Sequence, residues 1–80
     1  MNMLFILCQN RQREALLDEI ADWKDEGANV VLAGVTHKIR DGFIILEWCK
    51  PVPERFLQKL KEDPDIIDFV PIGHTTTAQP

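Results

Sequence analysis

Side chains capable of nucleophilic or anion-binding chemistry gather in two stretches of this chain. Cys8 is followed closely by two arginines, and three further cations come together some 25 residues later. If a helix begins after Cys8, its free backbone amides and nearby cations would favour a bound anion. The same surroundings would lower the pKa of the Cys8 thiol, as a reactive cysteine requires. We therefore predict a small-anion site and leave open a thiol enzyme that uses Cys8. The anion-binding residues would be Arg11, Arg13, His37, Lys38 and Arg40.

The residues that are missing limit the chemistry further. The chain has no serine and no tyrosine, which excludes a serine nucleophile and a tyrosine acid or base. Cys49 and His74 could form a pair of metal ligands, but a closed zinc site needs four, and no CxxC or HxxxH spacing supplies the others. The four glycines form no phosphate-binding loop. We expect no metal and no cofactor, and we favour a non-enzymatic protein over the thiol enzyme left open above.

Composition indicates a single small soluble domain. Of the 80 residues, 45% are hydrophobic and 28% are charged, and thirteen acidic residues against nine basic ones give a net charge of −4. This balance argues against nucleic acid as the default partner. Met1–Cys8 is apolar but lacks a basic segment before it and a cleavage site after it, so we interpret it as a strand, and no run reaches membrane-spanning length. Two cysteines without a secretion signal predict free thiols and a cytoplasmic protein.

Apolar periodicity divides the chain into six elements. Helices are predicted between Asn10 and Gly27 and from Pro53 onward, each with an apolar stripe at helical spacing. The Asp41-Gly42 pair predicts a hairpin turn between the second and third strands. The four predicted strands are Met3–Cys8, Asn29–Ile39, Phe43–Cys49 and Ile66–Ile72.

The order β-α-β-β-α-β predicts an α+β fold of a particular topology. Two right-handed crossovers with a hairpin between them give a four-stranded antiparallel sheet of order 4-1-3-2 with both helices on one face. Pro71 agrees with an edge position for the last strand, since a central strand would lose a hydrogen bond there. We predict one domain over residues 1–74 and a flexible tail over 75–80.

The sheet face away from the helices is the most informative predicted surface. If the alternation Ile44, Leu46, Trp48 points to the helices, Phe43, Ile45 and Glu47 point away from them. Such a patch usually marks an interaction site, so we predict a homo-oligomer that forms through the sheet. The alternative is a monomer whose open face is covered by residues 75–80. The predicted interface residues are Phe5, Phe43, Ile45, Glu47 and Val70.

Over nearly its whole length the chain resembles the ferredoxin-like superfamily, particularly small ACT-like and PII-like regulatory domains. The stretch 60–70, Leu-Lys-Glu-Asp-Pro-Asp-Ile-Ile-Asp-Phe-Val, is similar to the helix end, turn and edge strand with which those domains close. Such relatives assemble through their sheets and bind small metabolites or ions at the interfaces. The resemblance therefore implies a self-associating regulatory or ligand-binding module.

A second resemblance supports a different class of function. Residues 41–48, Asp-Gly-Phe-Ile-Ile-Leu-Glu-Trp, loosely resemble the first RNA-contact motif of RNA-recognition domains, and residues 4–7 resemble the second. Under this alternative Phe5 and Phe43 would stack on bases. The sequence departs from the motif at three positions, where Asp41, Ile44 and Ile45 replace a basic, a small and an aromatic residue.

Overall fold

The structure, a computed structural model, describes residues 2–38 and 40–72. Within them four strands and two α-helices follow one another in the predicted order, and a short 3-10 turn lies on each side of the first helix. The strands are β1 (Asn2–Cys8), β2 (Ala28–Val35), β3 (Gly42–Trp48) and β4 (Ile66–Ile72). The helices are α1 (Arg13–Ala21) and α2 (Glu54–Glu62), and the 3-10 turns are η1 (Asn10–Gln12) and η2 (Lys24–Glu26).

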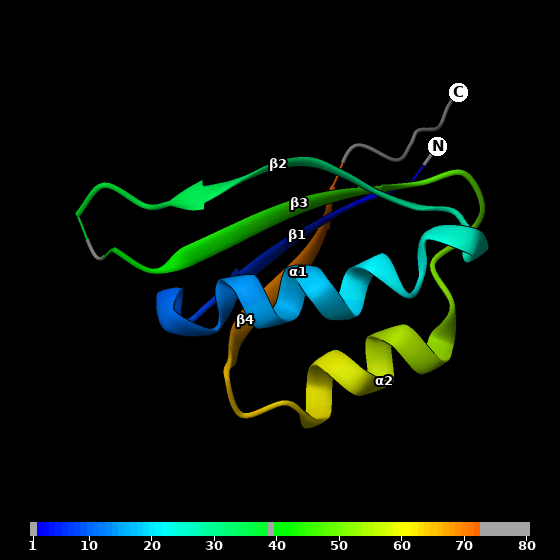
Figure 1. Ribbon diagram of the computed structural model, residues 1–80. Helices are drawn as coiled ribbons and strands as arrows, with labels where there is room; N and C mark the ends of the chain where they lie inside the picture. Colours follow the sequence, from blue (N-terminus) through cyan, green and yellow to red (C-terminus); the bar gives the residue numbers. More distant parts are fainter. Residues whose placement is uncertain (1, 39, 73–80) are drawn as a thin grey trace.

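The four strands form one sheet of order β2-β3-β1-β4, in which all neighbouring strands are antiparallel. This is the predicted order 4-1-3-2 read from the other edge. Both helices lie on the same side of the sheet (Figure 1). The prediction of an α+β fold with this topology is therefore confirmed, and the arrangement is compatible with a ferredoxin-like plait.

The core lies between the sheet and the helices. On the two central strands the residues that face the helices are almost fully buried. From the helices, Leu16 and Ile20 of α1 and Phe56 and Leu60 of α2 pack against them. Burial of each such side chain stabilises the fold by about 1.5–3 kcal/mol. The buried residues of the two central strands are Leu4, Ile6, Cys8, Ile44, Leu46 and Trp48.

Aromatic side chains close the core at one end. The indole of Trp23, which follows α1, lies edge-on to Trp48 and to Phe56, with ring centroids 6.3 and 5.0 Å apart. The Arg55 guanidinium lies over the Trp23 ring and also pairs with Glu26. Because these residues come from α2, β3 and the segment after α1, the cluster links both helices to the sheet.

The hairpin between β2 and β3 differs from its prediction. Strand β2 ends at Val35 and not at Ile39, because Thr36 and Asp41 bond to each other across the loop. The Thr36 N–H donates to the Asp41 carbonyl at 2.8 Å, and the Asp41 N–H donates to the Thr36 hydroxyl at 3.0 Å. Arg40 takes the left-handed conformation (φ 64°), while Gly42 already belongs to β3. The Asp41-Gly42 pair therefore follows the turn instead of forming it.

Two predicted features lie outside the described residues, namely the domain end at residue 74 and the tail over residues 75–80. None of the helices in the described part of the chain is long and apolar enough to cross a membrane.

Candidate functional site

The sheet face opposite the helices, called here the open face, is the largest candidate site. Residues that pair across antiparallel strands point to the same side of a sheet, so the strand register assigns its members. Eight of the twelve are apolar, and none is basic. The open face consists of Met3, Phe5, Leu7, Asn29, Leu32, Gly34, Phe43, Ile45, Glu47, Asp68, Val70 and Ile72.

One row of the open face is apolar across all four strands. Leu32 of β2 pairs with Ile45 of β3, Ile45 pairs with Phe5 of β1, and Phe5 pairs with Val70 of β4. Ile45 and Phe5 are half-buried by their neighbours, but Leu32 is 54% exposed and Val70 is 44% exposed. Nothing in the described part of the chain covers this row, although a sheet gains stability when such a row is buried.

Two aromatic rings, Phe5 of that row and Phe43 beside it, lie side by side on the open face. The Phe5 and Phe43 rings are within 7° of parallel, with centroids 6.0 Å apart. Phe43 also lies over Gly34 of β2, where an added Cβ would approach its ring to 3.1 Å. Gly34 therefore gives the Phe43 ring its place on the sheet.

Two carboxylates flank the apolar row on opposite sides. Glu47 is half-buried beside Met3 and Asn29, and Asp68 is exposed beside Leu7. Asp68 accepts a hydrogen bond from the Phe69 N–H at 2.8 Å. Glu47 has no hydrogen bond or ion pair with any other described residue. A half-buried carboxylate without a partner is a group that water or a second molecule must solvate.

All five residues predicted for the interface lie on the open face: Phe5, Phe43, Ile45, Glu47 and Val70. Leu32 was missed. A bulge between Val30 and Leu32 shifts the register, so that Leu32 joins the open face while Val30 pairs with Leu46 on the helix side. The uniform run Val30-Val31-Leu32 carries no sequence signal for the position of that bulge.

The five predicted anion-binding cations do not share a cavity. Arg11 is exposed in η1, just before α1. His37, Lys38 and Arg40 are exposed in the hairpin, which extends past this end of α1 (Figure 1). Arg13 is half-buried, and its Nη1 lacks a hydrogen-bond partner. None of the five lines the cavities described below. Anion binding by this group stays a prediction.

The environment of Cys8 is the opposite of the one predicted for a reactive thiol. Cys8 is fully buried, and burial raises the pKa of its thiol above the usual 9.0. The carboxylates of Asp41, Asp63 and Asp65 raise this pKa further, and the Arg13 guanidinium opposes them. The prediction of a lowered pKa at Cys8 is wrong, first because the thiol is buried, and second because acidic residues from the hairpin and from the loop before β4 lie near it and oppose Arg13.

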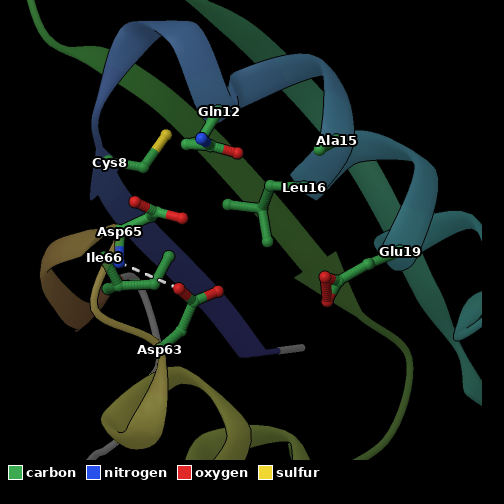
Figure 2. A pocket seen from close by; sticks show the side chains of 8 residues that line it. All are labelled: Cys8, Gln12, Ala15, Leu16, Glu19, Asp63, Asp65 and Ile66. Atoms are coloured by element: carbon green, nitrogen blue, oxygen red, sulfur yellow. Dashed lines mark hydrogen bonds between the residues drawn. The ribbon is translucent and has the colours of Figure 1, made fainter.

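A small cavity adjoins this thiol. It measures about 60 Å³ and lies between α1 and the segment that leads into β4. Figure 2 shows Cys8, Gln12, Glu19, Asp63 and Asp65 around it, with the Asp63 side chain accepting a hydrogen bond from the Asp65 N–H at 2.9 Å. Glu19 pairs with Lys59 of α2 at 2.8 Å. The cavity is therefore acidic and far too small for a metabolite, whose sites usually measure 300–1,000 Å³.

Cys49, the second thiol, is exposed just after β3. Its predicted neighbour His74 lies outside the described residues. Within residues 2–38 and 40–72, no three His, Cys, Asp or Glu side chains are placed so that they could hold a metal ion.

Two larger hollows lie on the helix side of the sheet. One, of about 230 Å³, separates α1 from β2. The other is a mainly apolar groove of about 430 Å³ bounded by α2, β1, β4 and the loop before α2. We call it the α2–β4 groove. No sequence pattern indicates this groove, because its residues belong to four segments and none of these segments forms a motif.

Comparison with known protein families finds no match, and comparison with curated proteins finds no significant one. The open face, the thiols and the cavities are therefore the features from which a function can be inferred.

Proposed function

We propose that this protein is a self-associating, non-catalytic domain of the ferredoxin-like type, two copies of which pack open face to open face. The observation that supports this most is the apolar row Leu32–Ile45–Phe5–Val70, which crosses the whole sheet and is most exposed at its two ends. Sheets commonly pack face to face through such rows, at a separation of about 10 Å.

The dimensions of the open face favour a weak dimer. Four strands about 4.8 Å apart and seven residues long span a rectangle of roughly 19 by 23 Å. Its flat area, roughly 440 Å², is below the 800 Å² or so that each partner of a standard interface buries. We expect a dissociation constant in the micromolar range.

The charges of the open face are compatible with a second copy as the partner. Glu47 and Asp68 lie in different rows on either side of the apolar row. A copy could therefore bury the row and leave both carboxylates near water at the margin. Those carboxylates would limit affinity, because the open face has no cation that could pair with them.

Other features argue against the two alternatives. An RNA-binding face requires cations for the phosphates, whereas the open face carries two carboxylates and no basic residue. A thiol enzyme requires an accessible thiolate, whereas Cys8 is buried with a raised pKa. The free thiols of Cys8 and Cys49 are compatible with a cytoplasmic location, which we retain as part of the proposal.

Sedimentation equilibrium between about 1 and 500 μM tests the proposal. The parent chain should pass from monomer to dimer across this range, while Leu32→Lys combined with Val70→Lys should stay monomeric. The matched control is Val35→Lys, also on β2 and 38% exposed, which pairs with Gly42 on the helix side. The control should dimerise like the parent.

Two results would overturn the proposal. If the parent chain stays monomeric at 500 μM, the partner of the open face would be a different protein and not a second copy. A dimer that survives the double substitution would be formed by another surface. Binding of a single-stranded oligonucleotide that Phe5→Ala abolishes would instead support the RNA-binding alternative.

A further inference from the structure

The α2–β4 groove combines the size and the lining of a small-molecule site. Its volume of about 430 Å³ lies within the 300–1,000 Å³ typical of such sites. Leu57 and Phe69 form its walls from α2 and β4, and both remain half-buried, so their apolar surface is incompletely covered. Val52 and Pro71 add further apolar surface at its ends.

The groove exists because of how α2 packs on the sheet. Phe56 and Leu60 point into the core and are almost fully buried. Leu57 and Lys61 lie one position further along the helix, which turns them toward β4. At β4 they meet Phe69 and Pro71, and the short proline ring leaves the space between helix and strand partly unfilled.

Of the described residues that line the groove, Lys61 alone is charged. Each of the other two cations on α2 has a carboxylate partner, Arg55 with Glu26 and Lys59 with Glu19. Lys61 has no ion pair or hydrogen bond with any residue in the described part of the chain. Its i, i+4 relation to Leu57 puts the ammonium group one turn from the apolar wall.

We propose that the α2–β4 groove binds an amphipathic monoanion, a medium-chain carboxylate whose alkyl chain lies against Leu57, Phe69 and Val52 and whose carboxylate pairs with Lys61. The lining offers apolar surface for the chain and one positive charge for the head. The cavity beside Cys8, of about 60 Å³, is too small for the alkyl chain, and the charged residues that line it are acidic. Binding at the groove does not require a second copy of the protein, so it is independent of the proposed dimer.

The proposal can be tested by titrating decanoate, below its micellar concentration, into the ¹⁵N-labelled full chain. Amide shifts should saturate and centre on Val52, Leu57 and Phe69. Lys61→Gln should weaken decanoate binding about threefold to fivefold, as the loss of an exposed ion pair does. Lys59→Gln, on the same helix but paired with Glu19, should leave decanoate binding unchanged. The neutral analogue decanol should bind the parent, Lys61→Gln and Lys59→Gln equally.

A variant that fills the α2–β4 groove with a larger side chain gives a second, independent test of the proposal. Val52→Trp should abolish the binding of both decanoate and decanol. If that variant does not fold, the Lys61→Gln variant still tests the proposal, because Lys61 is exposed and its substitution should not disturb the fold. Three outcomes would overturn the proposal: no saturable shifts, a decanoate affinity that Lys61→Gln does not change, or shifts centred on Leu32, Ile45 and Val70 of the open face.

Discussion

The two faces of the sheet are almost equally apolar, yet only one is buried. On β3 the alternation is complete: Ile44, Leu46 and Trp48 have no exposed surface, while Phe43, Ile45 and Glu47, which alternate with them, are half-buried. The difference arises from the helices, which cover the first face and leave the second. The helix-covered face therefore determines whether the chain folds, and the open face is available for binding.

The adjacent residues Ile44 and Ile45 test this comparison with the same side chain on opposite faces. Ile44→Ala should lower the free energy of unfolding by about 2–5 kcal/mol, because it leaves a cavity in the core. Ile45→Ala should lower the free energy of unfolding of the dilute monomer clearly less than Ile44→Ala does, but it should weaken self-association. Urea unfolding at low protein concentration measures the first effect, and sedimentation equilibrium measures the second. Equal losses of stability would contradict the division between a folding face and a binding face.

Two glycines offer a second matched pair. A Cβ at Gly42 would lie 3.2 Å from the Asn10 Cα and from the Cys8 sulfur, so Gly42→Ala should destabilise the fold by about 1–3 kcal/mol. A Cβ at Gly34 would meet only the Phe43 ring, which can turn aside on the open face. Gly34→Ala should therefore lower the stability of the fold less than Gly42→Ala does. Thermal unfolding of both variants shows which one is less stable. A larger loss of stability in Gly34→Ala would show that the open face is the more rigidly packed.

The two thiols should differ in reactivity as their surroundings differ. Exposed Cys49 should react with a thiol reagent at neutral pH at least 100-fold faster than buried Cys8, which reacts only when the core opens. Mass spectrometry of the modified peptides shows which cysteine reacts first and how fast each one reacts. Comparable rates would mean that the helix-covered face opens readily.

The raised pKa of Cys8 also predicts a pH dependence. The folded state holds this proton more tightly than the unfolded state, whose thiol titrates near 9.0. The resulting stabilisation is complete below pH 9 and is lost as the pH rises through the folded-state pKa. The stability difference between the parent and Cys8→Ala should therefore narrow above pH 9 in urea titrations. A constant difference from pH 7 to 11 would refute this linkage.

The smallest effect is expected from the carboxylate on the open face. Glu47→Gln should strengthen the dimer several-fold, because it removes a half-buried charge for which the open face has no cation. Asp68→Asn is the control and should change the dissociation constant less, since Asp68 is already exposed. Sedimentation equilibrium of both variants measures the change. A weaker dimer with Glu47→Gln would indicate that Glu47 makes a favourable contact with the second copy.

Several features of the fold could be predicted from particular residues. The alternation Ile44, Leu46, Trp48 predicted the buried side of β3, and Pro71 agreed with an edge strand. Gly27, which ends η2 with φ 107°, was expected at a helix end. These signals are local, because each depends on side-chain period or on one residue's backbone preference.

The features that escaped prediction depend on particular contacts that the apolar periodicity does not indicate, most of them between distant segments. The turn at Arg40 follows from the pairing of Thr36 with Asp41, and Leu32 reaches the open face only through a bulge against β3. The pKa of Cys8 rises mainly because the fold buries the thiol, and Asp63 and Asp65, more than 50 residues away in the chain, add to the rise. The α2–β4 groove likewise requires four segments to meet.

The sequence by itself determined the element order, the sheet topology and the presence of apolar residues on both sides of the central strands. It could do so because periodicity and turn chemistry act over a few neighbouring residues. Only the tertiary structure decided which cysteine is buried, which charges surround it and where the surface is hollow. Burial, electrostatic environment and cavities depend on residues that are far apart in the sequence and that only the fold brings into contact. No local sequence pattern indicates those contacts.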